Sequence, residues 1–212
     1  MVTIKPVVID ISHYDRADPD GFQKARAFGI VGVIHKASEG AGIGDGAYDE
    51  HRQAAVAAGL LWGAYHFIRP VSVEAQVELF LRRAKPDDQT LLALDYEVGS
   101  VTLSQARDFI ERVEAKIGRD CVLYSGNTIK ENLGSKADSW WGARRLWLAQ
   151  YSSRPRVQRS WNKYWLWQYT GDGSGPAPHA VPGIHIQGGL DISHFDGTAD
   201  ELRDQWPGKC TT

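Results

Sequence analysis

Three short segments carry acidic side chains that could cooperate in acid–base chemistry. Residues 9–15 read Ile-Asp-Ile-Ser-His-Tyr-Asp and recur almost letter for letter as Leu-Asp-Ile-Ser-His-Phe-Asp at residues 190–196. The third segment is the apolar run 91–94, which leads into Asp95 and Glu97. Residues two apart in a strand point to the same face, so these two carboxylates should project together with α-carbons roughly 6 to 7 Å apart.

The repeated segment suggests that the first and last strands lie side by side and close the sheet into a barrel. Barrel enzymes keep their chemistry at one rim, so we expect Asp10 and Asp191 on the same rim as Asp95 and Glu97. Glycoside hydrolysis needs two carboxyl groups, one protonated to assist the leaving oxygen and one ionised to stabilise positive charge or activate water. An Asp-x-Glu pair alone also describes a solvated strand end, but crowding by the other acids would keep Glu97 protonated near neutral pH.

The elements that must position these residues alternate between strand and helix along the first 125 residues, which implies parallel pairing. The expected strands are residues 7–11, 30–35, 60–68, 91–96 and 122–125, and the expected helices are 20–28, 45–59, 72–85 and 102–117. After Gly134, the strand-like segments 146–151, 164–169 and 189–192 are joined by loops instead of full helices. We therefore predict an α/β fold, an irregular TIM-like barrel of five βα units followed by three strands. The glycine-rich stretch 171–176 should form a mobile loop near the carboxyl rim.

Composition sets the outer bounds of the interpretation. A chain of 212 residues with 42% hydrophobic content suits a single domain spanning residues 1–212. A net charge of −2, with acids and bases interspersed, offers no nucleic-acid footprint and no basic membrane patch. Two cysteines, Cys121 and Cys210, imply no disulfide framework and leave their pairing open. We find no long apolar span and expect no signal peptide in this chain.

Aromatic residues gather in the second half of the chain. Six of the eight tryptophans fall between Trp140 and Trp167, and segments 146–151 and 165–169 carry aromatics at period two. Sugar rings stack on indoles and phenols, so aromatics beside carboxylates favour a carbohydrate cleft, while packing inside the barrel is the alternative for many of them. The candidates for ligand contact are those at or near strand ends: Tyr65, Tyr124, Trp147 and Tyr151.

His13 and His194 follow the repeated acids and invite a metal interpretation. Imidazoles and carboxylates at a barrel mouth can hold zinc or another divalent ion. However, the sequence contains no H-x-H, H-x-x-x-H or H-E-x-x-H spacing. We therefore expect both histidines to support neighbouring groups or turns, and we expect neither a metal nor another cofactor.

Eight blocks of the sequence, in order, resemble the glycoside hydrolase family 25 lysozymes, with similarity running from residue 8 to about residue 206. The blocks are residues 9–12, 36–40, 63–67, 94–97, 123–126, 147–151, 167–169 and 190–193. The resemblance implies a flattened barrel and hydrolysis of the β-1,4 bond between N-acetylmuramic acid and N-acetylglucosamine in peptidoglycan. It also implies Glu97 as the catalytic acid, with Asp95 as its electrostatic or positioning partner.

The same resemblance completes the expected site and leaves several questions open. Asp10 and Asp191 would complete the acidic rim, and Glu39 and Gln168, which lie in matching blocks, join the expected substrate contacts. A covalent sugar ester, assistance by the substrate's acetamido group and inversion by water all remain possible mechanisms. The family often carries a tryptophan soon after the first strand, where this chain has Phe22.

The biological setting follows from the resemblance as a set of expectations. Only a few residues follow the last expected strand, so we expect no separate cell-wall-binding module. We also expect a monomer. The enzyme would be a phage endolysin or a secreted or injected bacterial enzyme that acts on the peptidoglycan of the bacterial cell wall in the periplasm or outside the cell, with no nucleic-acid or membrane partner. The alternatives are a metal-dependent hydrolase on a similar barrel and a catalytically inactive glycan-binding domain.

Overall fold

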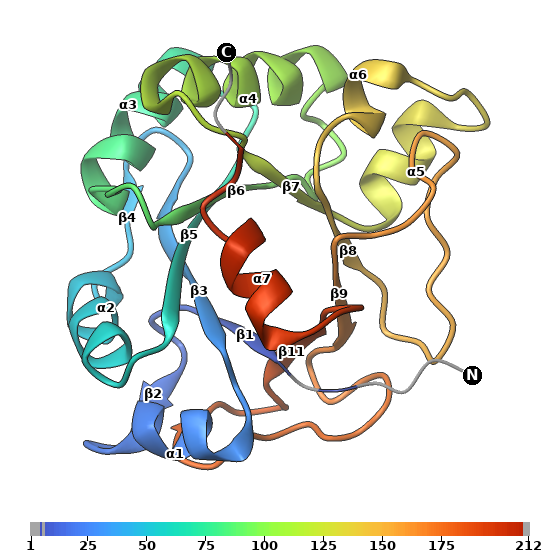
Figure 1. Ribbon diagram of the computed structural model, residues 1–212. Helices are drawn as coiled ribbons and strands as arrows, with labels where there is room; N and C mark the ends of the chain where they lie inside the picture. Colours follow the sequence, from blue (N-terminus) through green and yellow to red (C-terminus); the bar gives the residue numbers. More distant parts are fainter. Residues whose placement is uncertain (1–4, 6, 210–212) are drawn as a thin grey trace.

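The computed structural model describes residue 5 and residues 7–209, and within them eight strands close into a barrel (Figure 1). The barrel strands are β1 (Val8–Ile11), β3 (Gly32–Glu39), β5 (Leu61–Phe67), β6 (Leu91–Asp95), β7 (Val122–Ser125), β8 (Leu146–Ala149), β9 (Leu166–Thr170) and β11 (Asp191–His194). Because β1 pairs with both β3 and β11, the ring is complete. The expected barrel of five βα units followed by three strands is confirmed.

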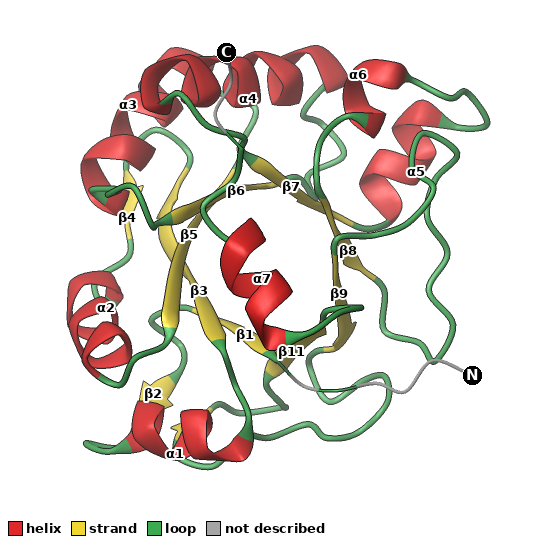
Figure 2. Cartoon of the chain, in the orientation of Figure 1, coloured by secondary structure: helices red, strands yellow, loops and turns green. Residues whose placement is uncertain are grey.

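Helices cover the outside of the barrel (Figure 2). They are α1 (Gly21–Phe28), α2 (Tyr48–Ala57), α3 (Val73–Ala84), α4 (Leu103–Ile117), α5 (Asn127–Leu133) and α6 (Ser139–Gly142). Local signals set the ends of the longest one, α4. Thr102 and Gln105 form a reciprocal capping box at its start, and Gly118, with φ of 68°, ends it in a left-handed conformation.

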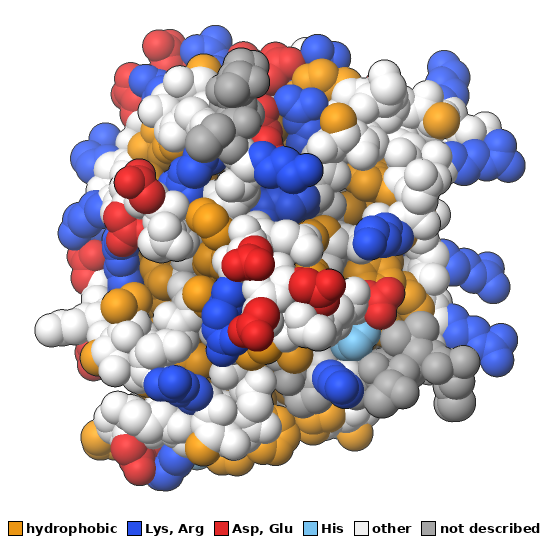
Figure 3. All heavy atoms as spheres, in the orientation of Figure 1, with side chains coloured by type: hydrophobic (Ala, Val, Ile, Leu, Met, Phe, Trp, Pro, Cys, Tyr) orange, Lys and Arg blue, Asp and Glu red, His pale blue; other side chains and the backbone are white. Residues whose placement is uncertain are grey.

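Three short strands and one further helix complete the fold. β2 (Arg16–Ala17) pairs with β10 (Ile184–His185), and β4 (Ile43–Gly44) pairs antiparallel with the end of β3. Helix α7 (Ala199–Gln205) lies across the amino end of the barrel, where Trp206 Nε1 donates to the carbonyl of Trp62 at 2.8 Å. In the space-filling view of this face, acidic side chains gather over α7 (Figure 3).

The expected neighbourhood of the first and last strands is confirmed, with a difference in direction. Asp10 lies directly opposite Asp191 in the β1–β11 pair. Strand β11 is antiparallel to both of its neighbours, whereas the other barrel strands run parallel. Asp191 therefore begins β11 while Asp10 lies near the end of β1, and this opposition brings both carboxylates to the same rim.

Several element boundaries differ from the sequence expectation for local reasons. The strand expected over residues 30–35 continues to Glu39 and so includes most of the matching block at residues 36–40. The helix expected from residue 45 begins at Tyr48, because the Asp45 side chain accepts hydrogen bonds from the backbone N–H groups of Ala47 and His13 before the helix starts. Helix α7 was not expected, although its capping box of Thr198 and Glu201 is visible in the sequence.

The core has two layers separated by the barrel wall. Alternate strand residues such as Val8, Ile34 and Ala93 pack inside the barrel, and their neighbours, such as Ile9 and Leu92, pack against the helices. Both layers are buried, which is typical of strands that are covered on both sides. Among the described residues, no helix is both long and apolar enough to cross a membrane.

Candidate active site

The two-residue period of the strands decides which side chains reach the carboxyl mouth of the barrel. In β1, Val8 faces the interior, so Asp10 does too; in β6, Leu91 and Ala93 face the interior, so Asp95 follows them. A cleft of about 220 Å³ lies at this end. Its lining consists of Asp10, Ser12, Tyr14, Lys36, Tyr65, Phe67, Asp95, Glu97, Tyr124, Trp147, Tyr151, Asp172 and Asp191. The four acids expected on one rim therefore share one cleft.

Asp95 and Glu97 lie on the same side of the chain, as the two-residue spacing predicts. Asp95 is the last residue of β6 and is buried, whereas Glu97 lies just beyond the strand and is exposed as a whole residue. Tyr96 between them points into the core, where its hydroxyl donates to the carbonyl of Val101 at 2.7 Å. The carbonyl of Glu97 accepts from Thr128 Oγ1 at 2.8 Å, which holds the backbone at this position.

Asp10 is oriented by a buried hydrogen-bond relay. Tyr124 Oη donates to Gln168 Oε1 at 2.8 Å, and Gln168 Nε2 donates to Asp10 Oδ2 at 2.9 Å. Gln168 is fully buried, and both ends of its amide are used. The structure thus places Gln168 behind Asp10, bonded to that carboxylate and not among the residues that line the cleft.

Burial and mutual repulsion raise the proton affinity of the acids. Burial raises the pKa of Asp10 and Asp95 well above the ordinary value, with further contributions from Asp191 to Asp10 and from Glu97 to Asp95. Burial and then the charge of Asp172 raise the pKa of Asp191 to about 7. Partial burial of its carboxyl group, followed by the charge of Asp172, also raises the pKa of Glu97. The cluster therefore retains protons toward neutral pH and titrates as a coupled group.

Three of these carboxylates keep one oxygen without a donor among the described residues. They are the buried Oδ1 atoms of Asp10, Asp95 and Asp191. A buried acceptor without a partner is costly, and the cost falls when a ligand supplies an N–H or O–H group. These unpaired oxygens agree with the raised pKa values, because a buried carboxyl group without a donor favours its neutral form.

The four aromatic candidates differ in how exposed they are in the cleft. Tyr65, Tyr124 and Trp147 line the cleft but are largely buried, and Trp147 Nε1 donates to Ser193 Oγ at 2.9 Å inside the barrel. Tyr151 is 39% exposed and lies at the mouth. Of the four, Tyr151 presents the most open ring surface to a ligand.

Comparison with known proteins identifies the family to which this chain belongs. The model of the glycosyl hydrolases family 25 matches residues 9–177. The chain belongs to glycosyl hydrolase family 25. Lysozyme M1 of Streptomyces globisporus is 28% identical over 215 residues, covering 92% of this chain and 69% of that protein.

Solved structures agree with this family 25 assignment. A bacterial lysozyme from Streptomyces coelicolor has a TM-score of 0.81 and 27% identity, covering 96% of this chain and 98% of the other. A muramidase from Trichobolus zukalii has a TM-score of 0.78 and 29% identity, covering 95% and 98%. The chain is therefore a glycosidase of family 25 with that family's barrel.

Five residues that line the cleft were not among the candidates from the sequence: Ser12, Tyr14, Lys36, Phe67 and Asp172. Tyr14 is 72% exposed and lies 4.0 Å from the ring of His13, measured between centroids. Lys36 is the one basic residue among those that line the cleft. Asp172 sits in a tight turn with φ of 50°. The Gly-Asp-Gly composition predicted that loop, but the sequence carried no signal that its acid folds over the cleft.

Glu39 lies beside the cleft and fixes Lys36. Its carboxylate contacts Lys36 Nζ and accepts from Arg69 Nε at 2.9 Å and Nη2 at 2.6 Å. The Lys36 ammonium also lies 5.2 Å from the centre of the Phe67 ring. Glu39 thus positions a cleft residue and does not itself line the cleft.

Neither His13 nor His194 is among the residues that line the cleft. His13 Nδ1 lies 2.8 Å from Asp45 Oδ2, and His194, at the far end of β11, contacts the backbone of Lys5. In the part of the chain that the structure describes, no group of three or more His, Cys, Asp and Glu side chains is arranged to hold a metal. Cys121 is buried, and Cys210 lies outside the described residues.

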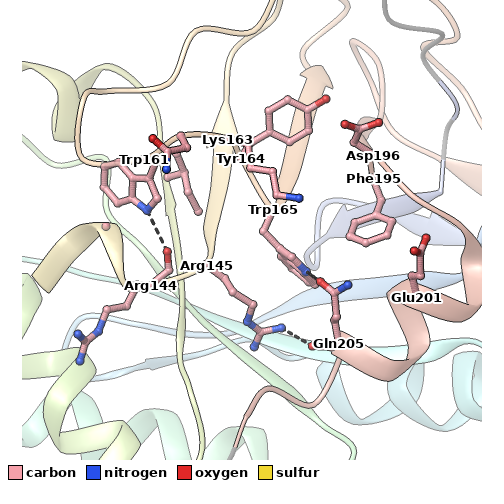
Figure 4. A pocket seen from close by; sticks show the side chains of 13 residues that line it. Arg144, Arg145, Trp161, Lys163, Tyr164, Trp165, Phe195, Asp196, Glu201 and Gln205 are labelled. Carbon is pink, nitrogen blue, oxygen red and sulfur yellow. Dashed lines mark hydrogen bonds between the residues drawn. The ribbon is translucent and has the colours of Figure 1, made fainter. Parts of the chain in front are cut away.

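A larger hollow, of about 420 Å³, lies at the opposite end of the barrel beneath α7 (Figure 4). Its polar groups serve the fold: Trp165 Nε1 donates to Gln205 Oε1 at 3.0 Å, and Arg145 donates to the Gln205 carbonyl. Glu201 accepts from the backbone of Thr198 in the α7 capping box. This hollow lies where α7 packs against the amino end of the barrel. Because its polar groups are used in holding α7, the smaller acidic cleft is the candidate active site.

Proposed function

We propose that this chain is a muramidase that hydrolyses the β-1,4 bond between N-acetylmuramic acid and N-acetylglucosamine in peptidoglycan. The observation that carries the proposal is the crowded acidic cleft, which Asp95 at the end of β6 and Glu97 just beyond it line together with Asp10 and Asp191. Membership of family 25 and the similarity to a lysozyme and a muramidase support this substrate.

Glu97 is suited to the role of general acid. Its carboxyl group lies at the open end of the cleft, and the neighbouring Asp172 helps it to keep a proton. A general acid must be protonated at the working pH and must reach the leaving oxygen. In the proposed reaction, Glu97 donates its proton to the glycosidic oxygen as the bond to the anomeric carbon breaks.

Asp95 is suited to orient the substrate. It lies on the same side of the chain as Glu97, which makes attack on the opposite face of the sugar difficult for it. Its carboxyl group lines the cleft and can accept the acetamido N–H of the substrate there. That bond would turn the acetamido oxygen toward the anomeric carbon, where it attacks as the leaving oxygen takes the proton from Glu97. Water then opens the resulting ring, and the configuration is retained.

Asp10 and Asp191 offer a second route on the same site. Either carboxylate, when ionised, could activate a water molecule for direct displacement with inversion. Proton NMR of the first-formed sugar anomer separates the routes: retention supports acetamido assistance, and inversion supports water activated by Asp10 or Asp191.

We infer that the enzyme acts on the cell wall outside the cytoplasmic membrane, as a monomer and without a cofactor. The test is turnover of purified peptidoglycan with and without chelator. Cleavage that persists in chelator supports the muramidase. Loss in chelator with recovery on adding zinc would support a metal-dependent hydrolase, and binding without cleavage would support an inactive glycan-binding domain.

A further inference from the structure

The acidic cleft continues past Glu97 into a second groove. This groove measures about 320 Å³ and shares Glu97 and Tyr151 with the cleft. Asn127, Thr128 and Gln150 form part of its lining. A polymer that crosses Glu97 for cleavage therefore has a continuous path into this groove.

Gln150, which lines the groove, forms hydrogen bonds with Lys130 and with the backbone of two arginines. Gln150 Oε1 accepts from Lys130 Nζ at 3.0 Å and from the backbone N–H of Arg156 at 3.0 Å. Gln150 Nε2 also donates to the carbonyl of Arg154 at 3.3 Å. These contacts fix Lys130 on α5 and the segment after β8 beside the same glutamine.

The segment after β8 has an unusual charge. Residues 150–163 contain Arg154, Arg156, Arg159 and Lys163 and no Asp or Glu, although the whole chain has a net charge of −2. Figure 3 shows Lys and Arg side chains projecting along the edge that carries α5 and this segment in Figure 1. The charge of the surface therefore changes from negative, in a cleft lined by five carboxylates, to positive along this segment.

These bases also lack acidic partners. Lys36, Arg69 and Arg144 each pair with a carboxylate, but within the described residues Lys130 and the four bases of the segment do not. Exposed arginines are often simply solvated. Lys130, however, is partly buried, and that burial lowers its pKa. A partly desolvated ammonium group without a counter-charge favours an anion from a ligand.

We propose that this groove binds carboxylates of the peptide stem of peptidoglycan, with Lys130 and Arg156 as the recognising charges. The inference rests on the proposed muramidase function. In a strand that carries stems, the lactyl carboxyl of muramic acid is bound in an amide, so the glycan itself is neutral and the stem supplies the anions nearest to the cleaved bond. Lys130 and Arg156 are thus specificity-determining residues.

The test compares two forms of one substrate. Soluble glycan strands with intact stems, freed of phosphodiester-linked polymer, are assayed with free stem carboxylates and after conversion of those carboxylates to methylamides. For wild type, kcat/KM should be roughly tenfold higher on the free carboxylates, which corresponds to about 1.4 kcal/mol. In the double variant Lys130→Met, Arg156→Gln, this ratio should fall to about one, chiefly through KM.

Lys116→Gln is the matched control. Lys116 is exposed in the last turn of α4, away from the cleft end, and its replacement removes the same kind of charge. This variant should keep the tenfold ratio. If the double variant does not fold, Arg156→Gln alone, on an exposed segment, should still reduce the ratio severalfold.

Other outcomes separate the two proposals. A wild-type ratio near one, or a tenfold ratio that survives the double variant, overturns stem recognition and leaves the muramidase intact. A preference that appears only on walls retaining phosphodiester-linked polymer also overturns it, in favour of that polymer. If wild type cleaves none of these substrate forms, the muramidase function itself is overturned.

Discussion

Replacement of Asp191 by Asn should make the folded protein more stable at pH 8 while lowering its activity. Asp191 lies opposite Asp10 in the β1–β11 pair, and its Oδ1 atom is buried without a donor among the described residues. Burial and Asp172 raise its pKa from 3.8 to about 7. The wild-type protein therefore loses stability when it must hold this carboxylate ionised, and asparagine has no charge to hold.

The sign and size of the effect follow from the pKa of Asp191. A carboxyl group whose pKa is higher in the folded state contributes stability that is fully present below about pH 4 and lost as the pH rises through about 7. A change in pKa from 3.8 to about 7 corresponds to about 4 kcal/mol. Because Asp191 keeps some contact with solvent, we expect Asp191→Asn to raise the free energy of unfolding at pH 8 by about 1 to 3 kcal/mol.

Urea unfolding followed by tryptophan fluorescence measures this difference at pH 4 and pH 8. Asp88→Asn, at an exposed position outside the cleft, is the control and should change the free energy of unfolding little at either pH. The reasoning is refuted if Asp191→Asn is no more stable than wild type at pH 8. It is also refuted if the gain is equal at pH 4, because the gain would then not come from the charge.

Four further predictions concern turnover. Glu97→Gln should lower kcat about 10²- to 10⁴-fold without unfolding the protein, and near wild-type turnover would remove Glu97 from the acid role. Asp95→Asn should also be severe, and a sugar ester on Asp95 detected by mass spectrometry would contradict its orienting role. Since the pKa of Glu97 is raised and that of Asp191 is about 7, kcat/KM should peak on the acidic to neutral side, and a profile still rising at pH 9 would contradict the protonated acid. Tyr14→Ala should raise KM roughly 3- to 10-fold with little change in kcat, because an exposed ring lost from the cleft mouth removes stacking only; an unchanged KM would exclude Tyr14 from binding.

The barrel and its acidic rim were largely predictable because strand periodicity is a local property. The alternation in residues 91–97 places Asp95 and Glu97 on one side, and Tyr96 in the core agrees with it. The repeated segment predicted the neighbourhood of β1 and β11. It could not predict that β11 runs antiparallel, because a repeated sequence specifies side-chain alternation and not strand direction.

The supporting contacts were less predictable because they depend on partners distant in the sequence. Gln168 is buried and bonded to Tyr124 and Asp10, and Glu39 is held by Lys36 and Arg69. The position of Asp172 was unpredictable for the same reason. Its turn was evident from glycine content, but its place over the cleft depends on how the segment between β9 and β11 folds back.

The identity of the new reducing ends tests the central claim most directly. Purified peptidoglycan is digested, the products are reduced with borohydride, and the reduced sugars are identified by mass spectrometry. We predict reduced N-acetylmuramic acid from wild type and almost none from a folded Glu97→Gln variant. Reduced N-acetylglucosamine as the main product, or equal release by the Glu97→Gln variant, would contradict a muramidase that works through this cleft.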